Sequence, residues 1–172
     1  RRQRQMCIRD SREDALRILR GLRFSASLGF EIEENTARAM HDNRELLNKI
    51  SAERVLSELC GLLTSRNSHR NIFRVLTEFR DIAAVIIPEF RECTGFVQHS
   101  RFHCFDVYEH CVMSAQKAAE ISAGSECRLP LTLAMLLHDI GKPQRFTLGE
   151  DGEGHFYGHA AVSADIAKDI PV

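Results

Sequence analysis

The sequence predicts an all-α protein with two helical units, and three observations lead to this fold class. Apolar residues recur at three- and four-residue spacing along most of the chain, as on the buried face of a helix. Hydrophobic residues make up 44% of the 172 positions, which is enough to build a core. Residues 88–102 lack the helical spacing and are interpreted as a connector. We therefore expect one unit over residues 11–87 and a second over residues 103–172.

The first unit begins with a predicted helix over residues 11–28, which places Leu16, Leu19, Leu22 and Ala26 on one apolar face. Gly29 directly after it favours the left-handed conformation that ends many helices. The further elements expected in this unit are a shorter helix pair over 34–50, a helix over 51–65 capped by Ser51, a helix from Ser68 to residue 81, and a short apolar segment that ends at Pro88.

The second unit begins with a long predicted helix that runs from about residue 106 to Ser122. The run LTLAMLLHD over residues 131–139 is nearly all apolar, which predicts a buried helix. Gly141 and Pro143 are expected to end that helix. The Asp-Gly pair in RFTLGEDGEGHFYG predicts one small β-hairpin, and a last helix is expected from Gly158 onward.

Composition excludes several classes of protein. The formal net charge is −1, so the chain is no general polyanion binder, and contact with nucleic acid requires a local basic patch. No stretch approaches the roughly 20 apolar residues of a membrane span, so no membrane association is expected. The cysteines form no C-x-x-C pair, which favours reduced thiols and a cytoplasmic protein; they are Cys7, Cys60, Cys93, Cys104, Cys111 and Cys127.

A histidine–aspartate pair stands out in the second unit. His138 and Asp139 are adjacent at the end of the apolar run. A carboxylate at the edge of a core is costly unless it is paired, and a bound cation would remove that cost. Imidazole nitrogen together with carboxylate oxygen suits Mn, Fe, Co, Ni, Zn or Mg rather than Ca. His110 lies on the apolar face of the preceding predicted helix. A lone histidine on such a face is usually a core residue with its hydrogen bonds satisfied, but the nearby His138-Asp139 pair favours a shared metal site.

The segments HCFDVYEHCVMSAQ, LAMLLHDIGKPQRF and GHFYGHAAVSADIA resemble the HD superfamily of metal-dependent phosphohydrolases. The resemblance implies four metal ligands, which are His110, His138, Asp139 and His159. His103 and His155 are weaker candidates. The resemblance also implies a final Asp on a later helix. Asp165 and Asp169 follow His159 too closely for that role, so we expect the chain to end before it.

The implied chemistry is hydrolysis of a phosphoester with a divalent cofactor, which we expect to be Mn, Ni or Mg. Asp139 would orient the attacking hydroxide, and His138 would share the catalytic centre. Lys142 follows the pair and has two interpretations. It contacts a phosphate oxygen as a third catalytic residue, or it is a solvated cation favoured by the C-terminal end of a helix dipole.

The first unit carries the pattern Glu-Asp-x-x-Arg at residues 13–17. Asp14 and Arg17 are three positions apart and therefore share a helix face. Together they can imitate the hydrogen-bonding edge of a base, although the same spacing also describes an ordinary surface ion pair. Arg17, Arg20 and Arg23 form a stripe that either contacts RNA or nucleotide phosphates or is a solvated face.

The segment REDALRILRGLRFSASLGFEIEENT, followed by KISAERVLSELCGLL, resembles the neck of bacterial tRNA nucleotidyltransferases (CCA-adding enzymes) and poly(A) polymerases. That resemblance implies tRNA as partner and ATP and CTP as substrates of the parent enzyme. It assigns Asp14 and Arg17 to base selection and Arg54 to support of the neck. It identifies the chain as neck and body followed by an HD domain.

The sequence lacks the motif of the family's head domain, which performs nucleotidyl transfer, because no D-x-D pair follows a G-S or G-G turn. We therefore expect a C-terminal fragment of the larger enzyme. Residues 1–10, with RQMCIRDS, resemble translated adaptor sequence and are expected to be non-native. Two alternatives remain: a stand-alone HD-type phosphohydrolase, and a non-catalytic RNA-binding helical module.

Overall fold

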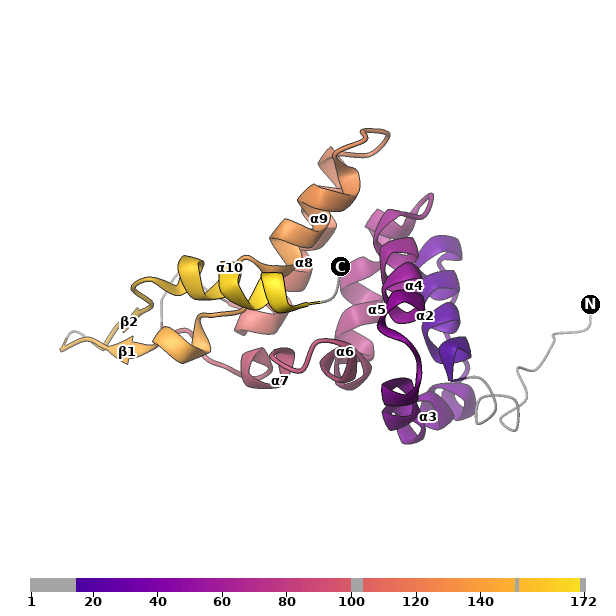
Figure 1. Ribbon diagram of the computed structural model, residues 1–172, viewed down its shortest axis with the longest axis horizontal. Coiled ribbons are helices and arrows are strands. Elements are labelled where there is room, and N and C mark those ends of the chain that lie inside the picture. The colour runs from indigo at the N-terminus through magenta and orange to yellow at the C-terminus, as the bar shows by residue number, and fades with distance from the viewer. Residues whose placement is uncertain (1–14, 100–103, 151, 171–172) are drawn as a thin grey trace, which may run out of the picture.

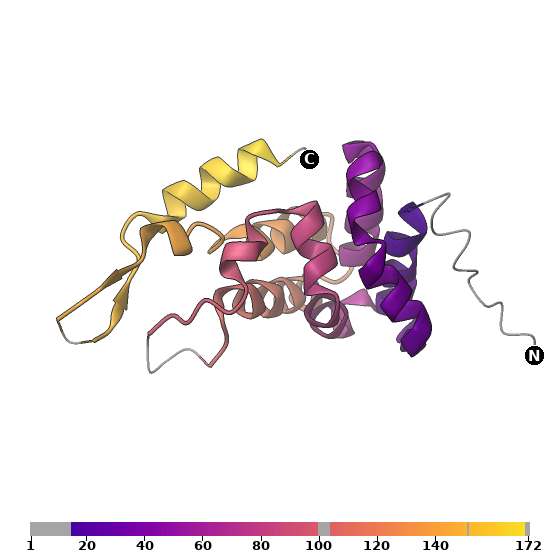
Figure 2. The same cartoon turned by 90° about the horizontal axis from the view of Figure 1, so that it is seen from below.

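The computed structural model describes residues 15–99, 104–150 and 152–170. Helices dominate these residues, and the strands among them form one antiparallel two-stranded hairpin. The predicted all-α class with one small hairpin is therefore confirmed. The N-terminal helices and the hairpin lie at opposite ends of the long axis (Figures 1 and 2). The expectation for residues 1–10 falls outside the described residues.

The N-terminal half follows the predicted order of helices, with one difference. The predicted helix from Ser68 to residue 81 is divided, because the chain turns at Asn71 and again at Phe79. The apolar segment before Pro88, for which the sequence predicted no conformation, is helical as far as Ile86 in α6. The elements are α2 (Leu16–Leu28), α3 (Glu34–Asp42), η1 (Arg44–Lys49), α4 (Ala52–Thr64), η2 (Ser68–Arg70), α5 (Ile72–Glu78) and α6 (Arg80–Ile86).

The ends of these helices show how local sequence sets them. Gly29 has a φ of 71°, and its N–H donates to the carbonyl of Ser25, which is the predicted left-handed end of α2. Ser51 occupies the N-cap position of α4, but its side chain makes no capping hydrogen bond. Helix α3, in contrast, has a side-chain cap: the carboxylate of Glu33 accepts hydrogen bonds from the backbone N–H groups of Asn35 and Thr36.

The C-terminal half also keeps the predicted order. A short helix lies within the segment that was expected to be a connector. Asp106 caps the long helix, since its carboxylate accepts from the N–H of Glu109 at 2.7 Å. The hairpin pairs Thr147 with His155 and Leu148 with Gly154. The elements are α7 (Phe90–Cys93), α8 (Val107–Ile121), α9 (Arg128–Leu137), η3 (Pro143–Arg145), β1 (Thr147–Leu148), β2 (Gly154–His155) and α10 (His159–Asp169).

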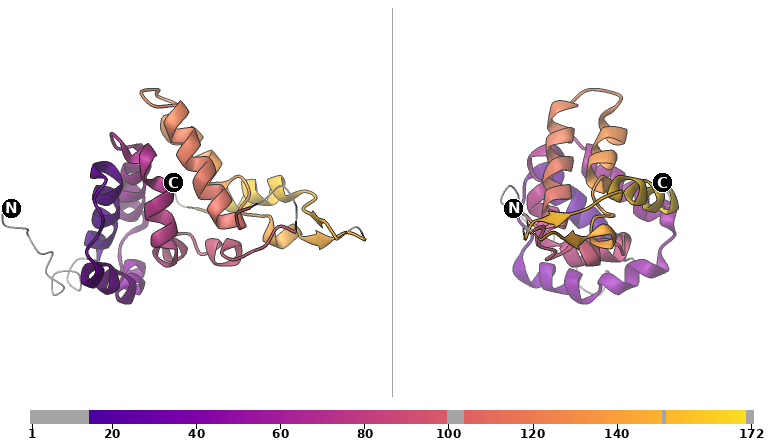
Figure 3. Two further views of the ribbon diagram at one scale, coloured as in Figure 1. Left: turned by 180° about the vertical axis from the view of Figure 1, so that it is seen from behind. Right: turned by 90° about the vertical axis from the view of Figure 1, so that its left-hand side faces the viewer.

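One continuous hydrophobic core runs through both halves of the chain. Helices α8 and α9 run side by side, and α5 and α4 pack against them (Figure 3). The side chain of Tyr108 is fully buried, and its hydroxyl donates to the carbonyl of Leu76 at 2.7 Å. The N–H of Phe73 donates to the side-chain carbonyl of Gln116 at 2.8 Å. The division into two units therefore remains a prediction from the sequence, while the packing joins them.

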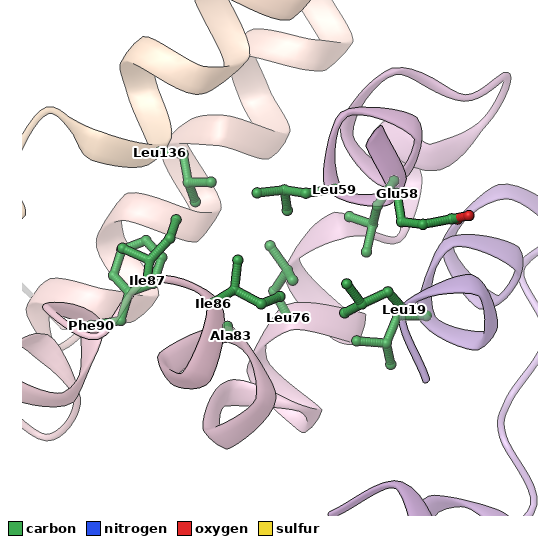
Figure 4. Close-up of a pocket in the computed structure, with 11 residues that line it drawn as sticks. Leu19, Glu58, Leu59, Leu76, Ala83, Ile86, Ile87, Phe90 and Leu136 are labelled. Atoms are coloured by element: carbon green, nitrogen blue, oxygen red, sulfur yellow. The ribbon is translucent and has the colours of Figure 1, made fainter. Parts of the chain in front are cut away.

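A small apolar pocket lies where the two halves meet (Figure 4). Leu19, Leu59 and Leu76 line it from one side, and Leu136 lines it from α9. Glu58 is its one charged lining residue, and the carboxylate points away from the pocket in Figure 4. Because the lining offers no converging polar groups, the pocket is a seam of the core rather than a reaction site.

None of the helices within the described ranges is both long enough and apolar enough to cross a lipid bilayer.

Candidate metal centre

Three helices bring the candidate centre together. His110 lies near the start of α8, and His138 and Asp139 directly follow the last residue of α9. His159 is the first residue of α10, which begins beside the end of α9 (Figure 1). The apolar run of α9 ends at Leu137, so the two polar residues emerge where the helix stops.

The carboxylate of Asp139 is the point on which the histidines converge. Its Oδ2 lies 3.4 Å from Nε2 of His110 and 3.2 Å from Nε2 of His138. Its Oδ1 lies 3.2 Å from Nε2 of His159. The potential ligand atoms of His110, His138 and Asp139 all lie within 4.8 Å of one another, and His159 reaches the carboxylate from its other oxygen.

Two of the histidines are held in the orientation that a metal ligand needs. The Nδ1–H of His138 donates to the carbonyl of Met135 at 2.8 Å, and that of His159 donates to the carbonyl of Phe156 at 2.7 Å. A carbonyl oxygen only accepts, so Nδ1 carries the proton and Nε2 faces Asp139. Backbone carbonyls commonly fix metal-ligating imidazoles in this way.

Electrostatics stabilise the anion at the centre. Burial alone would raise the pKa of Asp139, but hydrogen bonds and positive charge from His138 and Lys142 hold it well below its usual range. Burial alone would lower the pKa of His138, but its hydrogen bonds with Asp139 and Cys111 and the Asp139 charge raise it to about 10. The carboxylate is therefore ionised at neutral pH, and its charge can serve as a ligand for a metal ion.

Lys142 is buried, which contradicts its interpretation as a solvated cation. Its ammonium donates to Oδ2 of Asp139 and to the side-chain carbonyl of Gln98, both at 2.7 Å. It also lies 5.3 Å from the centre of the Phe156 ring. Gln98 reaches the centre from the segment before α8, a contact that sequence spacing could not predict. Lys142 thus lies beside the candidate ligands rather than on the surface of a helix end.

Gly141 was expected only to end a helix, yet it also sets how closely α10 approaches. A Cβ on Gly141 would lie 2.8 Å from the N of Ser163 and 2.9 Å from the carbonyl oxygen of His159. Both are backbone atoms, so a side chain there would push α10 away. The N–H of Gly141 donates to the hydroxyl of Ser163 at 3.0 Å, which fixes the contact.

The set of donors fits a divalent cation. Imidazole nitrogens and one buried carboxylate suit Mn, Ni, Zn or Mg, and none of them is a soft thiolate. The later aspartates contribute nothing in the described residues. Asp165 pairs with Lys168 at 2.8 Å on the exposed side of α10, and Asp169 is exposed at its end.

The remaining candidates lie elsewhere or outside the described residues. Asp14 and His103 fall in parts of the chain that the structure leaves undescribed. The ring of His155 stacks on Tyr157 and is not part of the close ligand group. Arg17 is half-buried at the start of α2, and Arg54 is exposed on α4.

Arg20 and Arg23 share one carboxylate. Nε of Arg20 donates to Glu58 at 3.0 Å, and Nε of Arg23 donates to its other oxygen at 2.8 Å. A Cβ on Gly61 would lie 2.5 Å from Cδ of Arg23, so this glycine makes room for the arginine to cross α4. Glu58 is the last residue of the S-x-E-R-x-x-x-E segment. That segment therefore ties α4 to the arginine stripe of α2, which sequence spacing did not reveal.

Comparison with protein families finds one matching family model in each half of the chain. Residues 29–93 match the family model described as "Probable RNA and SrmB- binding site of polymerase A". Residues 107–172 match the HD domain model. The second match contains all four histidine and aspartate residues of the candidate centre.

Individual relatives place the two matches in one kind of protein. The chain is 34% identical over 168 residues to the A-adding tRNA nucleotidyltransferase of Deinococcus radiodurans, an alignment that covers 92% of this chain and 37% of the relative. It is 36% identical over 166 residues to the multifunctional CCA protein of Azoarcus sp., with coverage of 92% and 37%. The multifunctional CCA protein of Neisseria gonorrhoeae is 37% identical over 134 residues, with coverage of 76% and 31%. The chain therefore spans about a third of the length of these relatives. It belongs to the family of CCA-adding tRNA nucleotidyltransferases and poly(A) polymerases, with an RNA-binding body region followed by an HD domain.

Proposed function

We propose that the HD region of this chain is a metal-dependent phosphohydrolase within a protein that processes the 3′ end of tRNA. The observation that carries this proposal is the buried Asp139 carboxylate with three imidazole Nε2 atoms within 3.4 Å of it. His110, His138, Asp139 and His159 would hold the metal. Manganese, nickel and magnesium are the ions we would test first.

Each residue has a part in the proposed hydrolysis. A bound divalent cation would lower the pKa of a water molecule and neutralise charge on the phosphoryl group. Asp139 stays ionised at neutral pH and can accept a hydrogen bond from that water. His138 and His159 keep fixed orientations through their Nδ1–H bonds to backbone carbonyls. Lys142 keeps a positive charge beside the carboxylate, near where a phosphate oxygen would approach.

The body region would bind tRNA and nucleotides in the whole protein. The match of residues 29–93 to an RNA-binding family model supports RNA as partner. Asp14 and Arg17 would select CTP or ATP through the edge of the base. Arg20 and Arg23 would contact phosphates, because each brings a guanidinium that Glu58 engages through its Nε. The Arg23 guanidinium also lies over the Phe24 ring, 4.5 Å from its centre.

Hydrolysis by the full chain tests the proposal. The rate of cleavage of bis(p-nitrophenyl) phosphate would be measured with Mn²⁺, Ni²⁺ and Mg²⁺ and after chelation. We expect metal-dependent cleavage that Asp139→Asn abolishes. Asp165→Asn is the matched control, because it makes the same chemical change on exposed α10. Equal rates in wild type and Asp139→Asn would overturn the proposed activity.

One observation favours a second candidate function. Lys142 already neutralises Oδ2 of Asp139 at 2.7 Å, as expected of an HD fold that has lost its metal and serves only as an RNA-binding module. This alternative expects tRNA binding that weakens steeply with salt, together with no metal-dependent cleavage. The same cleavage assay, run beside a tRNA-binding assay, decides between them.

A further inference from the structure

We propose that Gln98 is a positioning residue that holds the Lys142 ammonium at the metal centre. The inference rests on the proposed phosphohydrolase function, in which Lys142 meets a phosphate oxygen of the substrate. The side-chain carbonyl of Gln98 accepts a hydrogen bond from that ammonium at 2.7 Å. Both residues are buried, with Gln98 2% and Lys142 7% exposed. Gln98 would therefore act through Lys142 rather than on the substrate itself.

The Lys142 ammonium carries three N–H donors, so it can serve more than one acceptor. Within the described ranges, one donor meets Oδ2 of Asp139 at 2.7 Å and another meets the side-chain carbonyl of Gln98. A metal ion bound to Asp139 would weaken the first contact, because the ion and the ammonium repel each other. The contact with Gln98 uses a different acceptor and would persist. The ammonium would then keep its place, with a donor left for a phosphate oxygen.

The hairpin fixes the backbone of Gln98. The N–H of Gly154 in β2 donates to the carbonyl of His99 at 2.8 Å. A Cβ on Gly154 would overlap the backbone carbonyl oxygen of Gln98, so the two segments approach more closely than a side chain would permit. His99 adopts a φ of 46°, which is uncommon for a residue other than glycine. These contacts hold the segment before α8 against β2 and set the position of Gln98.

Aromatic rings pack beside the contact between Gln98 and Lys142. The ring of Phe156 lies 5.3 Å from the ammonium, and that of Phe96 lies 6.4 Å from Phe156 between centroids. A buried amide costs free energy unless it is hydrogen-bonded, and a hydrogen bond shielded from water is electrostatically stronger. The amide nitrogen of Gln98 makes only a longer contact, 3.5 Å from the carbonyl of Phe105. The bond to Lys142 thus explains a glutamine at a buried position where a residue that only filled space could be apolar.

Hydrogen exchange of the Lys142 ammonium tests the contact without metal or reaction. NMR of the full chain would follow the exchange rate of its protons, with the signal assigned by its loss in Lys142→Met. Gln98→Met removes the acceptor at similar size and should speed exchange about tenfold, as for loss of a charge-assisted hydrogen bond. Gln98→Glu keeps an acceptor and should keep exchange slow. Gln144→Met is the matched control, because it makes the same change at an exposed position in η3.

A second readout tests whether Gln98 acts through Lys142. With Mn²⁺, Gln98→Met should lower kcat/KM for bis(p-nitrophenyl) phosphate about tenfold, within the range for groups that support a metal site. In the Lys142→Met background the same change should have no further effect. Unchanged ammonium exchange in Gln98→Met, or losses that multiply in the double variant, would overturn the proposed role. Absence of metal-dependent cleavage in wild type would instead refute the phosphohydrolase, and the exchange measurement would still decide whether Gln98 holds the ammonium.

Discussion

The ammonium of Lys142 lies 2.7 Å from Oδ2 of Asp139, the same oxygen that His110 and His138 approach. A metal ion bound at this centre would therefore compete with the lysine for one buried carboxylate. Their competition gives the first prediction about the centre.

Replacing Lys142 with Met should have opposite effects on folding and on metal binding. The metal-free chain should lose up to about 3 kcal/mol of unfolding free energy, because the buried carboxylate loses its ammonium partner and keeps only the histidines. Affinity for Mn²⁺ should rise, since a positive charge beside the cation is gone. Denaturant unfolding with and without Mn²⁺ measures both. Weaker Mn²⁺ binding in Lys142→Met would show that the lysine supports the metal rather than competes with it.

Metal binding should strengthen as pH rises. The pKa of His138 is raised to about 10 in the metal-free chain, so its imidazole is protonated at neutral pH. A metal ion binds only the neutral ring and must displace that proton. Below about pH 10 the apparent affinity should rise about tenfold per pH unit for the one proton released. Calorimetry in buffers of different ionisation enthalpy counts the proton, and a pH-independent affinity would contradict this account.

Gly141→Ala should weaken the centre without altering a ligand. The new Cβ would lie 2.8 Å from the backbone N of Ser163, so α10 must shift and carry His159 with it. Overpacking of this kind costs about 1–3 kcal/mol of stability. Loss of support around a ligand commonly reduces metal affinity about 10- to 100-fold.

Ser163→Ala provides the control for that variant. It removes the hydrogen bond from the Gly141 N–H but adds no atom at the contact. We expect it to retain most of the Mn²⁺ affinity. If both variants lose affinity equally, the hydrogen bond rather than the close approach positions His159.

Glu58→Gln tests whether the arginine stripe contacts RNA. The change removes the negative charge that Arg20 and Arg23 share, at a stability cost of about 1 kcal/mol or less because both pairs are partly exposed. If the stripe binds phosphates, tRNA affinity should increase and the salt dependence should steepen by about one charge.

The matched control is Glu53→Gln, which makes the same change at an exposed position in the first turn of α4. Filter binding over a series of salt concentrations measures both variants. Identical salt slopes for the two variants would remove Arg20 and Arg23 from the RNA interface.

The sequence was most informative where chemistry and periodicity coincide. His138 and Asp139 could be identified because two polar residues end an otherwise apolar run. The hairpin could be predicted from the Asp-Gly pair, since that turn has a strong local preference. α6 was missed, because a short apolar run does not distinguish a buried helix from other buried segments.

Contacts between distant segments could not be predicted. A lysine at a helix end has the same pattern whether it is solvated or folded onto a carboxylate, so the burial of Lys142 became apparent only in the structure. Gln98 lies 44 residues before it, in a segment without periodicity. Glu58 reaches Arg20 and Arg23 across 38 and 35 residues. Such pairs depend on tertiary packing, which spacing in one sequence does not encode.

The most direct measurement of the central claim is the stoichiometry of metal binding. Calorimetric titration of Mn²⁺ into the full chain should show one ion bound per chain in wild type and in Asp165→Asn. The double variant His138→Ala, Asp139→Ala should bind none at that site while keeping the helical content of wild type by circular dichroism. Undiminished binding of one ion by the folded double variant would contradict the assignment of the centre.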